Sequence, residues 1–170
     1  MSGLYIDTVK ELLERHPSSA PAIGAPERAT LTYGGLRDLV DRTIAALNAM
    51  GVGRNDRVAL VLPNGPEMAT SFVAVACGAT TAPLNPGYRG EEFDFYLSDL
   101  NAKALVILEG MDSPARAVAA ERKIPVVELV PNREGGAGDF TLKAPAGLAG
   151  SPAKGGAAQP EDIALVLHTS

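Results

Sequence analysis

The sequence offers few side chains that could perform chemistry, and these do not cluster along the chain. The single cysteine, Cys77, closes an apolar run and is expected to be a buried small side chain rather than a nucleophile. His16 and His168 lie at opposite ends with no other histidine or cysteine nearby, so no zinc site is predicted. The remaining candidates are the hydroxyls of Thr169 and Ser170, which follow an apolar run and are expected to open a loop.

The common nucleotide-binding and hydrolase signatures are absent. No glycine is followed by lysine, as a Walker A loop requires, and no Gly-x-Ser-x-Gly elbow occurs. Gly136 and Gly138 begin a dinucleotide-like pattern, but Thr141 stands where its third glycine should be. A generic Rossmann-like nucleotide binder is therefore disfavoured.

The composition restricts the class of protein further. The chain has 170 residues, of which 46% are hydrophobic, enough for one folded domain with a core. Its net charge of -5 argues against nucleic acid as the main partner, because phosphate binding needs clustered lysine and arginine. No signal peptide is recognisable, and no apolar run approaches the ~20 residues of a membrane span. A cytoplasmic protein without a membrane span is expected.

The elements that position the candidate side chains follow from hydrophobic periodicity. Thr8 and Glu11 form a capping box before a short helix, and residues 21–24 and 29–33 are expected to form a hairpin. Beyond the hairpin, apolar strands alternate with amphipathic helices, which predicts an α/β fold with a mostly parallel sheet flanked by helices. The expected strands are residues 58–62, 80–84, 104–108 and 125–129, and the expected helices are residues 36–50, 67–77, 93–100 and 115–122.

The chain divides into three parts by composition. Residues 1–130 hold the alternating elements, and residues 131–160 are a connection in which 18 of 30 residues are glycine, alanine or proline. With little to bury, this connection is expected to be a mobile surface segment, with a short strand at residues 139–143. Residues 161–170 contain the apolar run 163–167, expected to be a strand buried on both faces, and then the hydroxyls. An ending of this kind suggests a chain cut on its way into a loop.

Three segments together resemble the adenylate-forming superfamily, which includes acyl-CoA synthetases, peptide-synthetase adenylation domains and beetle luciferases. Leu-Thr-Tyr-Gly-Gly-Leu at residues 31–36 is similar to an early family motif, and residues 53–60 look like its Gly-Asp-Arg-Val-Ala turn and strand. Residues 76–86, which end in Pro-Leu-Asn-Pro, are similar to its second core motif. His-Thr-Ser at residues 168–170 matches the opening of the family's phosphate loop, which normally continues Gly-Thr-Thr.

The resemblance implies that the chain is the N-terminal part of an acyl-CoA synthetase, partial and truncated. The intact enzyme would use ATP, Mg²⁺ and CoA to convert a carboxylate into an acyl-adenylate and then into a thioester. Thr169 and Ser170 would contact the ATP phosphates in an incomplete loop, because hydroxyls and glycine N–H groups bind phosphate. No catalytic or metal-binding residue is assigned within the chain. The fragment alone is expected to be inactive and to bind none of these cofactors.

Two local features refine the resemblance. Residues 85–88 and 92–100 are most similar to the oxalate–CoA ligase and small-dicarboxylate branch, so oxalate or another small acid is the expected substrate. The family's usual glutamate is replaced by Gly35, and Arg89 stands where a serine or threonine cap is expected, so both helix starts should be looser.

Polar and aromatic residues near the second motif could suggest a ligand site. Asn85 is expected to bond local backbone. Helical spacing favours core and helix-surface positions over a ligand-stacking cluster for the four aromatic residues of this region, Tyr88, Phe93, Phe95 and Tyr96.

A different class of function stays open. The chain could be a non-catalytic assembly module or a truncated gene product. Exposed sheet edges would then serve for self-association.

Overall fold

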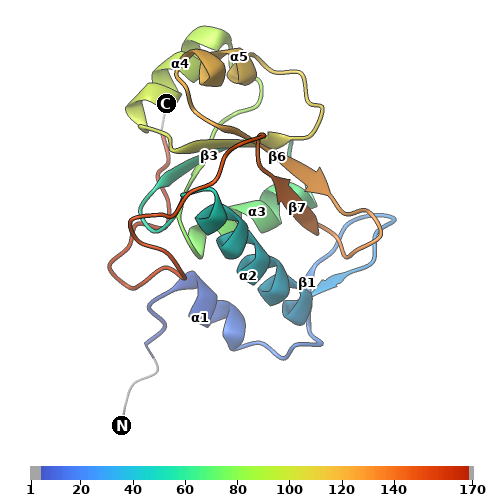
Figure 1. Ribbon diagram of the computed structural model, residues 1–170. Helices are drawn as coiled ribbons and strands as arrows, with labels where there is room; N and C mark the ends of the chain where they lie inside the picture. Colours follow the sequence, from blue (N-terminus) through green and yellow to red (C-terminus); the bar gives the residue numbers. More distant parts are fainter. Residues whose placement is uncertain (1–4, 169–170) are drawn as a thin grey trace.

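The computed structural model describes residues 5–168, which form five helices and seven strands (Figure 1). The helices are α1 (Val9–Glu14), α2 (Tyr33–Ala49), α3 (Pro66–Ala76), α4 (Gly90–Asp99) and α5 (Pro114–Glu121). The strands are β1 (Pro21–Ile23), β2 (Leu31–Thr32), β3 (Arg57–Val61), β4 (Thr80–Pro83), β5 (Ala104–Leu108), β6 (Val126–Pro131) and β7 (Phe140–Lys143). The predicted hairpin and the predicted alternation of strands and helices are confirmed. None of the described helices is both long and apolar enough to cross a membrane.

The main sheet has five strands in the order β4-β3-β5-β6-β7, and β1 pairs with β2 in a separate antiparallel hairpin. Strands β3 to β6 run parallel, whereas β7 is antiparallel to β6. Helices α4 and α5 lie on one face of this sheet, and α2 and α3 lie on the other (Figure 1). The mostly parallel α/β sheet flanked by helices is the predicted fold class.

Strand β3 shows why the sheet needs helices on both faces. In β3, Val58 and Leu60 pack into the core beneath α2 and α3, whereas Ala59 and Val61 pack into the core beneath α4 and α5. All four side chains are fully buried, as predicted for strands without polar alternation. The carboxyl ends of β3 and β4 are therefore held by a rigid, doubly covered sheet.

The helix starts are better capped than the substitutions at residues 35 and 89 predict. Thr8 and Glu11 form the predicted capping box of α1. The Thr32 hydroxyl still accepts a hydrogen bond from the Gly35 N–H at 3.2 Å. Of the two hydrogen bonds of a capping box, α2 therefore keeps the one made by the threonine side chain. At α4, the Glu92 carboxylate accepts a hydrogen bond from the Arg89 N–H at 2.9 Å. A carboxylate supplied from within the helix thus replaces part of the missing cap.

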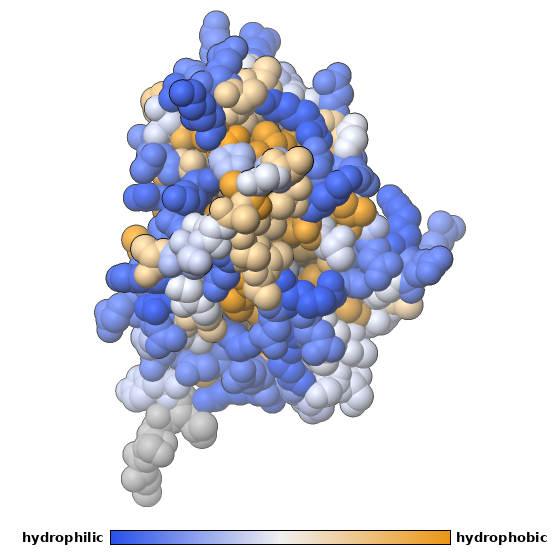
Figure 2. Space-filling model, viewed as in Figure 1, coloured by the Kyte–Doolittle hydropathy of each residue, from blue (hydrophilic) through white to orange (hydrophobic). Residues whose placement is uncertain are grey.

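The connection 131–160 packs against the body at several points. Ala137 is fully buried and Phe140 is 1% exposed, and β7 begins one residue after the predicted start. The Thr70 hydroxyl donates to the Gly138 carbonyl at 2.7 Å, and the Arg54 N–H donates to the Lys154 carbonyl at 2.8 Å. Figure 2 shows the face that carries α2 and β7, with hydrophobic residues at its centre and hydrophilic residues around them. The mobility of the connection stays a prediction, but hydrogen bonds hold its backbone to the body at Gly138 and at Lys154.

Residues 163–167 contradict the prediction of a strand buried on both faces. One bridge, between Thr81 and Leu165, joins them to the outer edge of β4. Ile163, Leu165 and Leu167 are 53%, 42% and 60% exposed, while the residues between them are half-buried. The physical reason is position, because this segment has one neighbouring strand, and no described element covers the face that carries these three side chains. We call residues 163–168 the edge segment.

A polar cluster holds the start of the edge segment. The Asp162 carboxylate accepts hydrogen bonds from the Arg54 Nε at 2.5 Å, from the Asn55 amide at 2.7 Å and from the Gln159 N–H at 2.7 Å. The Asn55 side chain in turn accepts from the Ile163 N–H at 2.8 Å. Polar contacts therefore hold the start of this segment, whereas apolar burial on both faces holds β3. We call Arg54, Asn55 and Asp162 the clasp.

Candidate functional site

A cleft of about 580 Å³ lies where β3, β4 and the edge segment reach their carboxyl ends. The chain leaves β3 toward α3 on one face of the sheet and leaves β4 toward α4 on the other face. In parallel sheets such a divergence opens a crevice between neighbouring loops, and ligands bind there. The residues that line it come from the ends of all three segments: Leu62, Pro63, Asn64, Met68, Pro83, Leu84, Asn85, Pro86, Tyr88, Leu167 and His168.

His168 connects the edge segment to α4 beside this cleft. Its imidazole Nε2 lies 2.9 Å from the Asp99 Oδ2, and its ring centroid lies 4.7 Å from that of Tyr96. The Tyr96 ring also stacks on Tyr88 at 4.9 Å. Asp99 thus contacts His168, His168 contacts Tyr96, and Tyr96 contacts Tyr88, which lines the cleft.

Of the four aromatic residues that were predicted to lie in the core or on the helix surface, two lie there and two are half-buried near the cleft. Phe93 is fully buried and Phe95 is 62% exposed, as predicted. Tyr88 and Tyr96 are half-buried, and Tyr88 lines the cleft. Hydrogen bonding with Tyr96 raises the pKa of the Tyr88 hydroxyl above its ordinary value.

The described residues that line the cleft are polar in places but include no acidic side chain, lysine or arginine. Asn85 is occupied locally, because its side-chain oxygen accepts from the Gly87 N–H at 2.9 Å, as predicted. Across residues 5–168 no group of three or more histidine, cysteine, aspartate or glutamate side chains could hold a metal ion. The described residues therefore do not by themselves fit Mg²⁺ with a triphosphate, which requires carboxylate ligands and cationic groups.

The two predicted phosphate-contacting residues, Thr169 and Ser170, lie outside the described residues. Their neighbour His168 belongs to the cleft wall. Cys77 is 1% exposed, and burial raises the pKa of its thiol to about 12, so it is the inert core residue predicted.

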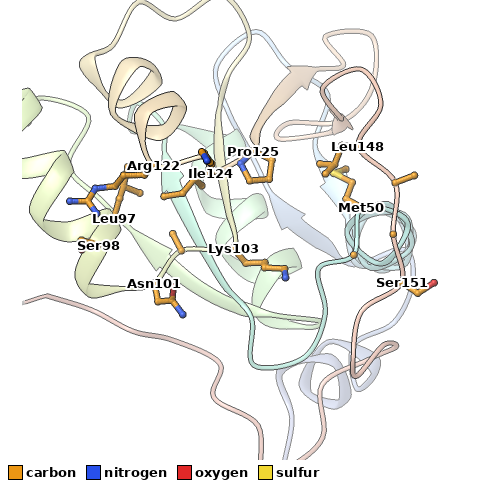
Figure 3. Close-up of a pocket in the computed structure, with 15 residues that line it drawn as sticks. Met50, Leu97, Ser98, Asn101, Lys103, Arg122, Ile124, Pro125, Leu148 and Ser151 are labelled. Carbon is orange, nitrogen blue, oxygen red and sulfur yellow. The ribbon is translucent and has the colours of Figure 1, made fainter.

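A second cleft of about 580 Å³ lies at the amino ends of β5 and β6. Figure 3 shows the side chains of Leu97, Arg122 and Ile124 on one side of it and Met50, Leu148 and Ser151 on the other. Its cations are Lys103, Arg122 and Lys123, and Arg122 is paired with Asp94 at 2.7 Å. Arg122 and Lys123 directly follow the last residue of α5, where positive charge stabilises the helix dipole. They are explained without a ligand, so the first cleft is the candidate site.

The link between His168 and α4 was not predicted from the sequence. Asp99 and His168 are 69 positions apart, and the sequence placed His168 only at the start of the phosphate loop, with no partner in α4. The order of the predicted strands could have indicated that His168 lies near the cleft, because residues that follow neighbouring parallel strands meet at one edge of the sheet.

Residues 9–170 match the model of a protein family described as AMP-binding enzyme. Among curated proteins, a probable CoA ligase, CCL9 of Humulus lupulus, is 38% identical over 82% of this chain and 27% of its own length. The oxalate–CoA ligase of Arabidopsis thaliana is 36% identical over 96% of this chain and 33% of its own length. The chain thus spans about a quarter to a third of the length of these relatives.

The solved structures agree on the fold. The crystal structure of apo MatB from Rhodopseudomonas palustris matches 96% of this chain and 32% of its own chain, with a TM-score of 0.70 and 22% identity. The structure of VinN matches 70% of this chain with a TM-score of 0.61 and 24% identity.

Proposed function

Because the chain belongs to the AMP-binding enzyme family, we propose that it is part of an ATP-dependent carboxylate–CoA ligase. The family match, which reaches from residue 9 to residue 170, carries this proposal. It is supported by the cleft at the carboxyl ends of β3 and β4, into which the edge segment leads. The proposed activity of the complete protein is the joining of a carboxylate to CoA with consumption of ATP.

The proposed substrate is oxalate or another small acid. Its support is the similarity to an oxalate–CoA ligase over 96% of this chain. In the complete protein, Thr169 and Ser170 would contact the ATP phosphates through their hydroxyls. The 170-residue chain alone is proposed to be inactive, because the described residues that line its cleft supply neither the cations nor the carboxylates that a Mg²⁺–triphosphate needs.

The test compares the 170-residue chain with the complete protein encoded by its gene. Exchange of pyrophosphate into ATP is measured with oxalate, 3-hydroxybenzoate, 4-coumarate and a long-chain fatty acid. We expect exchange from the complete protein with a small acid and none from the 170-residue chain. In the complete protein, Thr169→Ala combined with Ser170→Ala should abolish it. A complete protein that exchanges with no acid would refute the ligase proposal.

One observation favours a second function, a non-catalytic assembly module. Ile163, Leu165 and Leu167 form an exposed apolar row along the edge of the sheet, and such edges pair readily with another chain. Self-association of the 170-residue chain through this row would support it. Sedimentation at several concentrations measures this directly, and a monomer throughout would eliminate the second function.

The proposed setting is the cytoplasm, with small molecules rather than nucleic acid as partners. The net charge of -5 and the absence of lysine and arginine from the cleft lining support this. Cell fractionation tests the location, and a gel-shift assay at low salt tests nucleic-acid binding.

A further inference from the structure

The exposed apolar row of the edge segment lies on the same face of the sheet as α3. Leu165 pairs in register with Thr81 of β4, and Thr81 pairs with Val58 of β3, whose side chain lies beneath α2 and α3. Side chains in register on parallel strands point to the same face, so the row points toward the side that carries α3. Val166, between two members of the row, packs against the core on the opposite face.

Helix α3 continues this apolar surface. From residue 68 onward, the residues of α3 that are half-buried or exposed are Met68, Ala69, Phe72 and Val73, and their spacing puts them on one side of the helix. Met68 and Leu167 line the same cleft, so the helix and the row adjoin each other. We call these four residues of α3, together with the exposed row, the apolar patch.

Helix α3 lacks the charged outer side of the other helices that cover the main sheet. Its one charged residue, Glu67, is paired with Arg28 at 3.0 Å. The charged residues of the other three are Arg37, Asp38, Asp41 and Arg42 in α2, Glu91, Glu92, Asp94 and Asp99 in α4, and Arg116 and Glu121 in α5. A helix that borders water normally carries such residues on its outer side. The apolar patch therefore has the composition of an interface.

The backbone of the edge segment is open on the side away from β4. The Ala164 carbonyl accepts from the Thr81 N–H at 2.9 Å, and the Val166 N–H donates to the Thr81 carbonyl at 3.0 Å. Alternate residues of a strand point away from this neighbour, and among residues 5–168 the N–H and carbonyl of Leu165 have no hydrogen-bond partner. A further strand placed beside the edge segment would pair with these groups.

The length of the relatives indicates what covers the apolar patch. The chain spans 33% of the oxalate–CoA ligase and 32% of the chain of apo MatB, so both relatives contain far more chain than the part matched here. In a complete protein of that length, the chain that follows residue 170 would start beside the end of the exposed row. A partner tethered in this way has a high effective concentration at the patch, so it outcompetes a second copy in solution.

We propose that the apolar patch is the surface on which the chain after residue 170 packs in the complete protein, with one of its strands beside the edge segment. This inference rests on the proposed function, because it requires the chain to be part of a longer ligase. Uncharged, apolar surfaces are typical of permanent interfaces, which resemble a domain core cut in half. The packing would bury Ile163, Leu165 and Leu167, which are 53%, 42% and 60% exposed in the 170-residue chain.

Thiol labelling with a maleimide tests whether the apolar patch is covered. Leu165→Cys places a thiol in the row, and Ala117→Cys places a control thiol at an exposed position of α5. The native Cys77 is 1% exposed, and burial raises the pKa of its thiol to about 12, so it stays unlabelled. In a dilute solution of the 170-residue chain, both introduced thiols should be labelled readily. In the complete protein, labelling of Leu165→Cys should be roughly tenfold slower or more, and that of Ala117→Cys unchanged.

A charged substitution on α3 provides a second test. Ala69 and Ala117 are both exposed, and each is the fourth residue of a helix that begins with proline, so Ala69→Glu and Ala117→Glu form a matched pair. In the 170-residue chain neither should shift the midpoint of thermal unfolding by more than about 2 °C, because both carboxylates lie in water. In the complete protein, Ala69→Glu should accelerate labelling of Leu165→Cys roughly tenfold or more, because an unpaired charge is costly to bury. Ala117→Glu should have no effect.

Equal labelling of Leu165→Cys in the two proteins, or equal effects of Ala69→Glu and Ala117→Glu, would overturn the proposal. Slow labelling of the 170-residue chain that becomes faster on dilution would also overturn it, because a second copy would then cover the apolar patch. Circular dichroism first confirms that each variant is folded. Labelling does not depend on catalysis, so a complete protein without ligase activity would refute the proposed function, whereas the labelling would still decide whether the patch is covered.

Discussion

Two segments of this protein have nearly the same sequence and opposite environments. Residues 58–62 read Val-Ala-Leu-Val-Leu, and residues 163–167 read Ile-Ala-Leu-Val-Leu. In the first, Leu60 is fully buried in the centre of the sheet, whereas Leu165, at the same place in the second, is 42% exposed. The difference lies in the neighbours, because β3 has β4 and β5 beside it and helices on both faces, while the edge segment has β4 alone.

The comparison shows that an apolar pentapeptide specifies an extended conformation but not its burial. In β3, burial of each large side chain contributes about 1.5–3 kcal/mol. At the edge the corresponding side chains face outward, and the clasp with its buried Asp162 carboxylate takes over the role of holding the chain. The same five-residue pattern is therefore stabilised by apolar contacts on both faces in one place, and in the other by polar contacts together with apolar packing of Val166 on one face.

The sharpest test truncates the equivalent leucines. Leu60→Ala should lower the free energy of unfolding by about 2–5 kcal/mol, because it leaves a cavity in a covered core. Leu165→Ala should lower it by less than about 0.5 kcal/mol, since much of that side chain is already exposed. Urea unfolding of both variants measures the difference. Equal losses would show that the edge segment is covered in solution.

A second test asks whether the connection that leads to the edge segment is tethered. A Cβ at Gly53 would lie 2.1 Å from the Lys154 carbonyl oxygen, so Gly53→Ala must displace the connection. We expect a cost of about 1–3 kcal/mol, typical of overpacking, with faster proteolysis at Lys154. The matched control is Gly90→Ala, where a Cβ meets nothing within 4 Å. If Gly53→Ala is as stable as this control, the connection is not held there.

A third test removes the clasp. Asp162→Asn keeps the size of the side chain but loses the ion pair with Arg54, so the free energy of opening residues 159–166 should fall by about 1–2 kcal/mol. Amide hydrogen exchange should show this locally, with residues 58–62 unaffected. Loss of protection at residues 58–62 as well would mean that the two segments unfold as one unit.

The clasp also predicts a dependence on pH. Hydrogen bonding to Arg54, and then to Gln159 and Asn55, lowers the pKa of Asp162 from 3.8 to about 2. A carboxylate whose folded-state pKa is depressed contributes stability above its unfolded-state pKa and loses it as the pH falls toward the folded-state value. Protection of the edge segment should therefore decline between pH 3.8 and about 2. Asp162→Asn should abolish this decline, and an identical pH profile in the variant would assign it to other carboxylates.

The smallest expected effect on stability comes from polar substitutions on the exposed row. Ile163→Gln, Leu165→Gln and Leu167→Gln together should change the free energy of unfolding by under about 1 kcal/mol, because these side chains are already largely exposed to solvent. The same variant should reduce any self-association seen by sedimentation. A large loss of stability in the monomer would show that the row packs against its own chain.

The sequence by itself determined the class of fold and the order of its strands and helices. Periodicity predicted the mostly parallel sheet, and Thr8 with Glu11 predicted the cap of α1. Motif order indicated the family, and the family match bears this out. These features are local or depend on chain order, so residues close in sequence are sufficient to specify them.

Only the tertiary structure decided which apolar run is covered and which side chains meet. Residues 163–167 carry the pattern of a buried strand, but their place outside β4 leaves alternate side chains exposed. The contact of His168 with Asp99, and the clasp between Arg54 and Asp162, join positions 69 and 108 residues apart. No local pattern encodes such pairs, because they arise when parallel strands align their ends and bring distant loops to one edge of the sheet.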